Sequence, residues 1–141
     1  MKKIYIQSLF FFTILSNTLF GQAGNLDNSF GNGGKVITAV NAGSSEVWGM
    51  VVQDDWSIVV GGFVFNGIDS DFALIRYTPD GALDNTFGNN GIVTTAIGPG
   101  NDVIYSVALQ QDGKIVAGGM SWNGTNYDFA LARYNTNGSL D

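Results

Sequence analysis

The chain has 141 residues, with twelve acidic side chains against six basic ones and a formal net charge of −6. Such an acidic surface repels phosphate backbones, so nucleic acid is not expected as a partner. The chain contains no histidine and no cysteine. This composition excludes Ser-His-Asp and Cys-His catalysis, histidine-based zinc sites and disulfide bonds.

The amino-terminal segment has the pattern of a signal peptide. A short basic start is followed by a largely apolar run over residues 4–20, which polar side chains interrupt. Small residues at Gly21 and Ala23 suit a signal-peptidase site that cleaves before Gly24, with cleavage before Gln22 as the alternative. The run is shorter than the ~20 apolar residues of a membrane span. We therefore expect export, with no membrane span left after cleavage and no lipid anchor, because the chain has no cysteine.

The rest of the sequence repeats without gaps at one constant spacing. Residues 24–34 recur as 81–91, and residues 71–77 recur as 128–134. We call this constant spacing, by which residue 24 of the first unit corresponds to residue 81 of the second, the repeat period. A gapless period of this length indicates an array of like structural units. The predicted organisation is a signal peptide at 1–23, a first unit at 24–80, a second unit at 81–137 and the start of a third unit at 138–141.

Each unit contains four short runs that are rich in valine, isoleucine and aromatic residues and are separated by turn-forming residues. The predicted strands are 35–40, 47–53, 57–65 and 72–78 in the first unit, and 92–97, 104–110, 114–122 and 129–135 in the second. No window outside the amino-terminal segment has helical apolar spacing. Four strands per unit is the count of a β-propeller blade. The predicted fold is therefore all-β, with tandem four-stranded antiparallel units that make about two blades of an incomplete ring.

Turn residues add detail to this prediction. Asp112 and Gly113 predict a hairpin with a type I′ turn. The first unit has Trp56 in the place of Gly113, and tryptophan tolerates a positive φ poorly, so a different or longer turn is expected there. Glycine pairs at 61–62 and 118–119 lie within predicted strands, which indicates a bulge or a close approach of a neighbouring unit.

Three segments of the second unit, at 81–91, 110–119 and 128–134, closely resemble the bacterial delta-60 repeat. That family is regarded as β-propeller-like and occurs in long tandem arrays of exported and surface proteins. The resemblance extends over essentially residues 24–141 and implies no known catalytic activity. The amino-terminal segment also resembles the signal peptides of Bacteroidetes-type exported proteins. The first unit departs from the family pattern at Trp56, where the family favours Asp-Gly-Lys.

The most regular motif, Gly-x-Leu-Asp-x-Ser/Thr-Phe-Gly, is interpreted as an inter-blade turn. A phosphate loop is disfavoured because the motif lacks the Lys-Ser/Thr pair and opens no helix. Its leucines and phenylalanines are expected in the core, and its aspartates are expected to accept backbone N–H groups. The motif residues are Leu26, Asp27, Phe30, Leu83, Asp84 and Phe87.

Two arginines lie on otherwise apolar strands, Arg76 in the first unit and Arg133 in the second. A buried guanidinium needs a carboxylate partner. We expect each arginine to pair with an aspartate of the repeat. The candidate partners are Asp71 and Asp128, or Asp55 and Asp112.

No catalytic residue is assigned and no cofactor is expected. Asp69 and Asp71 are weak candidates for calcium, set against a role as ordinary turn residues. Aromatic residues that differ between the units are the candidates for binding a ligand at the surface. The candidate ligand contacts are Trp48, Trp56, Phe65, Trp122 and Tyr127.

These observations leave three functional hypotheses open. The first is a non-enzymatic, exported or cell-surface scaffold that presents surfaces to protein or glycan. The second is a fragment of a propeller enzyme that acts on extracellular polysaccharide, and the third is a purely structural spacer. Two units cannot close a ring of four to eight blades, so we expect further repeats in a longer chain or assembly into a homo-oligomer. The position of Asp141 within the repeat motif favours the longer chain.

Overall fold

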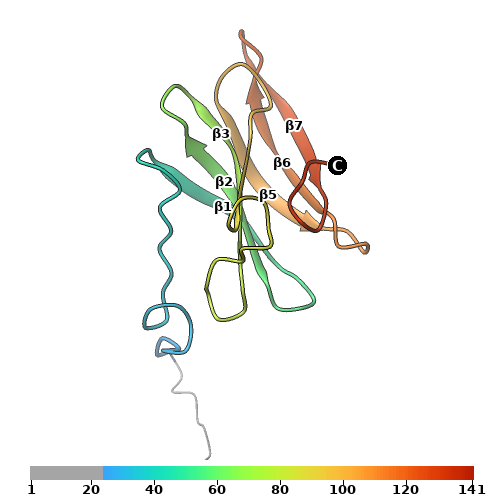
Figure 1. Ribbon diagram of the computed structural model, residues 1–141. Coiled ribbons are helices and arrows are strands. Elements are labelled where there is room, and N and C mark those ends of the chain that lie inside the picture. The colour runs from blue at the N-terminus through green and yellow to red at the C-terminus, as the bar shows by residue number, and fades with distance from the viewer. Residues whose placement is uncertain (1–23) are drawn as a thin grey trace, which may run out of the picture.

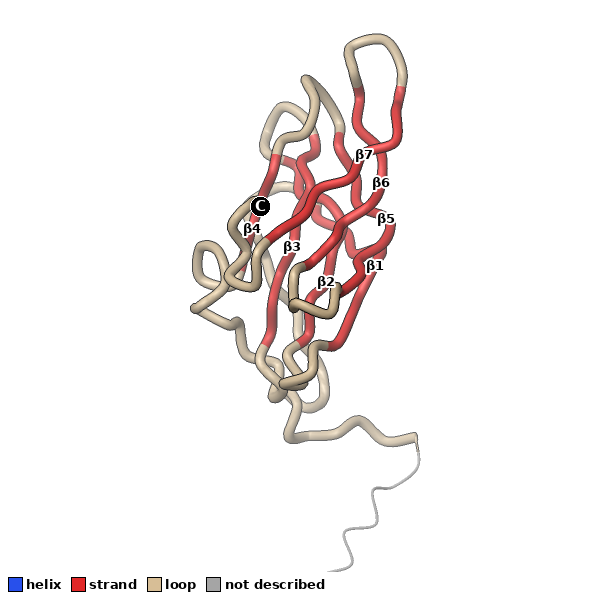
Figure 2. Tube along the Cα trace, turned by 90° about the vertical axis from the view of Figure 1, so that its right-hand side faces the viewer, coloured by secondary structure: helices blue, strands red, loops and turns tan. Residues whose placement is uncertain are grey.

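The computed structural model describes residues 24–141, so the predicted signal peptide lies outside the described residues. Within that range the chain is built from strands, turns and extended segments, with no helix (Figures 1 and 2). It accordingly has no helix of the length and apolarity needed to cross a membrane in this range. The strands are β1 (Ser45–Val52), β2 (Ile58–Phe65), β3 (Ser70–Tyr77), β4 (Ile92–Thr95), β5 (Asp102–Leu109), β6 (Ile115–Trp122) and β7 (Tyr127–Tyr134).

The strands form two antiparallel sheets that pack against each other. The first sheet has the order β1-β2-β3-β4, and the second sheet has the order β5-β6-β7 (Figure 1). One apolar core fills the space between them, because buried side chains of both sheets belong to a single cluster. The largest members of that cluster are Phe72, Leu74, Phe87, Ile104 and Tyr134. This arrangement confirms the predicted fold class, an all-β incomplete ring of propeller-like sheets.

Seven of the eight predicted strands are present, and the prediction of a strand at 35–40 was wrong. That segment is extended but belongs to no sheet, and Lys35 makes only an isolated bridge to Gly31. Its counterpart one repeat period later is β4, which pairs with β3 of the preceding unit. Each fourth strand therefore completes the sheet of the unit before it. Residues 35–40 have no preceding sheet within the described chain, so they remain unpaired.

The hairpin turns also differ from the prediction. At the β5–β6 turn the N–H of Gly113 donates to the carbonyl of Gln110 over 2.9 Å, and only Gly113 has a positive φ, of 80°. The turn is therefore not type I′, which needs a positive φ at both central residues. The β1–β2 turn has the same bond from Trp56 to Gln53, with φ of 67° at Trp56. The expectation of a different turn there was wrong, because tryptophan adopts the conformation that glycine has in the other copy.

Replacing Trp56 by glycine is expected to stabilise the chain by about 1 kcal/mol, because left-handed backbone costs a side-chain-bearing residue about that much. The indole is 74% exposed, so its removal sacrifices little buried surface. Urea denaturation of wild type and Trp56→Gly tests this. Gly113→Ala, which introduces a side chain at the equivalent left-handed position of the second copy, is the matched control and should be destabilised by a similar amount. A Trp56→Gly protein less stable than wild type would show that the indole contributes more than the strain costs.

The predicted bulge is present at both glycine pairs, whereas the predicted close approach of a neighbouring unit is present at the first pair only. Opposite the second glycine of each pair, the pairing register of β1 and β5 shifts, next to Trp48 and Tyr105 respectively. A Cβ on Gly62 would overlap the carbonyl oxygen of Glu46 in the paired strand. A Cβ on Gly61 would instead meet side chains of the second sheet. The bulges lie at Trp48 and Tyr105, and both of these aromatic side chains are exposed at the surface.

Candidate functional site

The bulges of β1 and β5 place two aromatic rings side by side. The ring centroids of Trp48 and Tyr105 are 5.8 Å apart with an interplanar angle of 84°, and both side chains are about half-exposed. This edge-to-face geometry is favourable for aromatic pairs. Because the two residues occupy the same position in their units, the pairing is a consequence of stacking one unit on the next.

The remaining aromatic candidates lie at the ends of the strands. Trp122 and Tyr127 face each other across the β6–β7 hairpin, with centroids 5.0 Å apart. Phe65 has the position of Trp122 in the first sheet and lies at the end of β2 that is remote from Trp56. A strand of this length separates its two ends by roughly 25 Å. The five predicted contacts therefore do not form one surface.

Trp56 stands apart from the other four candidates. It is at the tip of the β1–β2 turn, its backbone is in the left-handed region, and its side chain is largely exposed. The left-handed conformation belongs to the turn, since Gly113 adopts it in the other copy, but a tryptophan at this position brings strain that glycine avoids. Strained residues of this kind cluster at functional sites.

A hollow of about 570 Å³ lies next to this turn, between the β1–β2 and β5–β6 turns, which Figure 1 shows at the same end of the two sheets. Its lining is dominated by carboxylates and carboxamides, and it consists of Gln53, Asp54, Asp55, Leu109, Gln110, Gln111 and Gly113. None of the residues predicted as ligand contacts lines this hollow. The recurrence of glutamine at positions 53 and 110 was the available signal.

The polar side chains of the hollow are two carboxylates, which accept hydrogen bonds, and three glutamine amides, which both donate and accept. Asp55 accepts the backbone N–H of Ser57 over 2.9 Å, and this bond holds the pKa of the Asp55 carboxyl below its ordinary value. Asp55 is therefore ionised at neutral pH. The side-chain oxygen of Gln53 is buried without a hydrogen-bond partner.

The motif residues behave as expected in part. The carboxylate of Asp27 accepts the N–H of Ser29, and that of Asp84 accepts the N–H of Thr86, each over 2.9 Å. Phe87 is fully buried, Leu83 and Phe30 are half-buried, and Leu26 is exposed. The prediction that Leu26 enters the core was wrong, because no preceding sheet covers it within residues 24–141.

The predicted partners of the arginines were also wrong. Arg76 pairs with Asp84 at 2.7 Å, and Arg133 pairs with Asp141 at 2.5 Å. In both copies the acceptor is the motif aspartate eight residues further on, which is the separation given for both bonds. The aspartates proposed from the sequence have other roles in the strand ends and hairpin turns.

Asp69 and Asp71 both accept hydrogen bonds from the side-chain amide of Asn66, at 2.7 and 2.9 Å. The second copy has the same arrangement around Asn123, which donates to Asn126 and Asp128. In each cluster an asparagine amide donates to these side chains and so stabilises the hairpin turn. Within residues 24–141 no group of three or more acidic side chains is placed to hold a metal ion.

Comparison with known families agrees with the repeat architecture. Residues 53–87 and 110–141 match the family model described as a domain of unknown function (DUF5122) beta-propeller. The two matched stretches begin at positions 53 and 110, which are one repeat period apart. No curated protein matches the chain. The match supports a propeller-like repeat family and describes no activity.

Proposed function

We propose that the chain is a non-enzymatic, exported repeat scaffold that binds glycan at the turn around Trp56. The observation that carries the proposal is Trp56 itself, an exposed indole in a strained backbone conformation where the other copy has glycine. The signal-peptide pattern of residues 1–23 supports export. The propeller-like repeats support the role of a scaffold.

The chemistry of the turn suits a neutral saccharide. An indole face stacks on the apolar face of a sugar ring, because both surfaces are flat and poorly hydrated. The neighbouring hollow offers the carboxylates of Asp54 and Asp55 as acceptors to the sugar hydroxyls. Its carboxylates repel anionic glycans, so uncharged or amino-sugar polymers are the favoured class.

Titration of a panel of neutral oligosaccharides, followed by tryptophan fluorescence and calorimetry, tests the proposal. The Trp56→Gly variant preserves the turn, so we expect it to fold and to bind at least tenfold more weakly, which corresponds to about 1.4 kcal/mol. Trp48→Ala removes an equally polarisable, half-exposed indole elsewhere and is the matched control. Equal loss of affinity in both variants would contradict the assignment of the site.

The same panel separates the scaffold from its main alternative. Turnover of a glycan that disappears in an Asp55→Asn variant would indicate a propeller enzyme acting on polysaccharide. Binding without turnover supports the scaffold. Absence of any binding across the panel, with the fold intact by circular dichroism, would leave the spacer hypothesis as the better account.

A further inference from the structure

The outer face of the second sheet exposes apolar residues that the first sheet buries. Phe72 and Leu74 of β3 are 1% exposed and lie in the core between the sheets. Their counterparts on β7, Phe129 and Leu131, are fully exposed and 76% exposed, respectively. The same residues in the same strand positions are therefore covered in one sheet and uncovered in the other.

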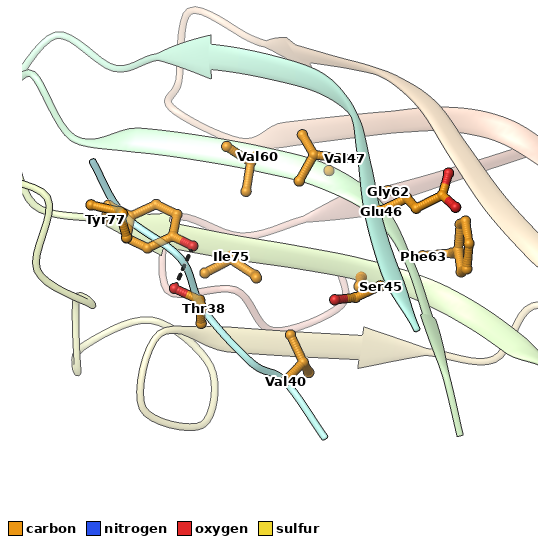
Figure 3. A pocket seen from close by; sticks show the side chains of 13 residues that line it. Thr38, Val40, Ser45, Glu46, Val47, Val60, Gly62, Phe63, Ile75 and Tyr77 are labelled. Carbon is orange, nitrogen blue, oxygen red and sulfur yellow. Dashed lines mark hydrogen bonds between the residues drawn. The ribbon is translucent and has the colours of Figure 1, made fainter. Parts of the chain in front are cut away.

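The outer face of the first sheet has the complementary surface. A cavity of about 180 Å³ is lined by β1, β2, β3 and residues 36–40, which we name the strap (Figure 3). Figure 3 shows the strap held by a hydrogen bond from the Tyr77 hydroxyl to Thr38, 2.8 Å long. The equivalent bond inside the molecule joins Tyr134 to Thr95 over 3.0 Å.

The cavity reproduces the internal surface that receives Phe72 and Leu74. Within the molecule, those two side chains share the core cluster with six positions of the second sheet: Ile104, Ile115, Ala117, Ala130, Ala132 and Tyr134. One repeat period earlier the corresponding residues are Val47, Ile58, Val60, Ala73, Ile75 and Tyr77, and all of them except Ile58 line the cavity. The aliphatic part of the cavity lining is thus a surface that fits a phenylalanine and a leucine from a face like that of β7.

An open strand edge lies beside the exposed face. In the first sheet β4 covers the edge of β3, with Leu74 opposite Val93 and Phe72 opposite Thr95. The second sheet has no fourth strand among the described residues, so the edge of β7 is unpaired. The strap corresponds to β4 in the preceding repeat, and it is extended and unpaired.

We propose that the second sheet binds the strap and the outer face of the first sheet of a second copy of this chain, head to tail. Phe129 and Leu131 of one copy enter the cavity of the next. The strap of the next copy joins the second sheet as its fourth strand, with Val36 opposite Leu131 and Thr38 opposite Phe129. The interface repeats the contact that already joins the two sheets within one chain.

The strap needs no rearrangement to take this place. It lies on its own first sheet in the same way as residues 92–97 lie on the second sheet. The hydrogen bond from Tyr77 to Thr38 corresponds to the one from Tyr134 to Thr95. The bond from the N–H of Gly31 to the carbonyl of Asp80 likewise corresponds to the bond from Gly88 to Asn137. Residues 24–27 of the incoming copy would overlap residues 138–141, which have the same repeat position. Lys114 and Arg133 hold Asp141 in place, so the exposed residues 24–27 of the incoming copy move aside.

The proposed contact joins two different surfaces. Such a heterologous interface leaves one free donor face and one free receptor face on a pair of copies, so it continues to a closed ring or an open filament. A covered β7 edge would also remove the hazard of an unpaired strand. The inference rests on the sheet faces and not on the proposed glycan site.

Cysteine cross-linking tests the register, because the chain has no cysteine of its own. Full-length Val36→Cys chain is mixed with full-length Leu131→Cys chain and oxidised. Directly opposite residues in antiparallel strands have Cα atoms about 4.5–5.5 Å apart, within the range of a disulfide. We expect a disulfide-linked heterodimer. The control mixture pairs Leu131→Cys with Ile37→Cys, whose side chain points to the other face of the strand, and should cross-link at least tenfold less.

Sedimentation velocity over a wide range of concentration provides the second measurement. Wild type should associate, and Phe129→Asp should remain monomeric, because a carboxylate cannot enter the apolar cavity. Ile68→Asp is the matched control, since Ile68 is similarly exposed but lies in the β2–β3 turn. A monomeric wild type, equal cross-linking in the two mixtures, or efficient Leu131→Cys homodimers would overturn the proposal.

Discussion

Replacing Gly119 by alanine is expected to destabilise the chain by about 4 kcal/mol or more, which is a large part of the roughly 5–15 kcal/mol that holds a domain folded. A Cβ at this position would lie inside the van der Waals envelope of the Val103 carbonyl oxygen in the paired strand. Both atoms belong to the backbone of one sheet, so neither moves without breaking the β5–β6 ladder. Denaturant unfolding at a concentration where the chain is monomeric measures the loss.

The adjacent glycine is the matched control. A Cβ on Gly118 meets only the side-chain end of Leu131, at 3.1 Å, and that side chain is exposed and free to turn. Gly118→Ala should therefore change the free energy of unfolding by less than about 1 kcal/mol. Gly62→Ala, at the bulge of β1, should behave like Gly119→Ala. A small effect at both bulge positions would mean that the two strands separate more easily than their register indicates.

The strands were predictable because each carries β-branched and aromatic residues between glycine and asparagine turns. Seven of eight predicted strands are present for that reason. The eighth, at 35–40, has the same local sequence pattern as β4 but no partner strand within residues 24–141. A strand exists only when a neighbour accepts its backbone hydrogen bonds. The local sequence shows only that a segment can form a strand. The repeat pattern does not show which other strand, if any, it pairs with.

The turn at Trp56 was mispredicted for a different reason. Residue preferences treat each turn alone, and a positive φ is unfavourable for tryptophan. The turn is nevertheless retained, because Gln53 and Ser57 complete the same hydrogen bonds as Gln110 and Lys114 in the other copy. The surrounding ladder imposes the conformation. The same tertiary effect brings the two turns together and forms the hollow, for which the recurring glutamines at positions 53 and 110 were the only trace in the sequence.

The Arg76→Ala variant is expected to lose about 3 kcal/mol of stability, the second large effect in this fold. The Arg76 side chain is 11% exposed, and its guanidinium binds Asp84 at 2.7 Å, the carbonyl of Thr136 at 2.6 Å and the hydroxyl of Thr86 at 3.1 Å. Its central carbon lies 4.6 Å from the centre of the Phe87 ring. One side chain thus joins the motif turn to the turn that follows β7.

Arg133 provides the matched comparison, because it has the same position in the second copy and the same kind of partner, Asp141. Its side chain is 50% exposed, so solvent screens the ion pair. Arg133→Ala should cost less than about 1 kcal/mol. Unfolding of both variants in urea at low concentration measures the difference. Equal losses of stability in the two variants would contradict the explanation that the burial of Arg76 makes its ion pair the stronger one.

The Arg76–Asp84 pair also predicts how stability depends on pH. Bonds from the hydroxyl and the N–H of Thr86, together with Arg76, hold the pKa of Asp84 below its ordinary value of 3.8. A depressed pKa in the folded state means that the carboxylate stabilises the fold fully above the ordinary pKa, and that this contribution is lost as the pH falls through the lowered pKa. Wild type should therefore lose stability more steeply than Asp84→Asn as the pH falls below about 4. The variant, already weakened at neutral pH by the uncompensated guanidinium, should show the shallower acid limb. Parallel acid limbs in the two proteins would place the acid sensitivity in the other aspartates, Asp27, Asp55, Asp80 and Asp141, whose pKa values are also lowered by local hydrogen bonds.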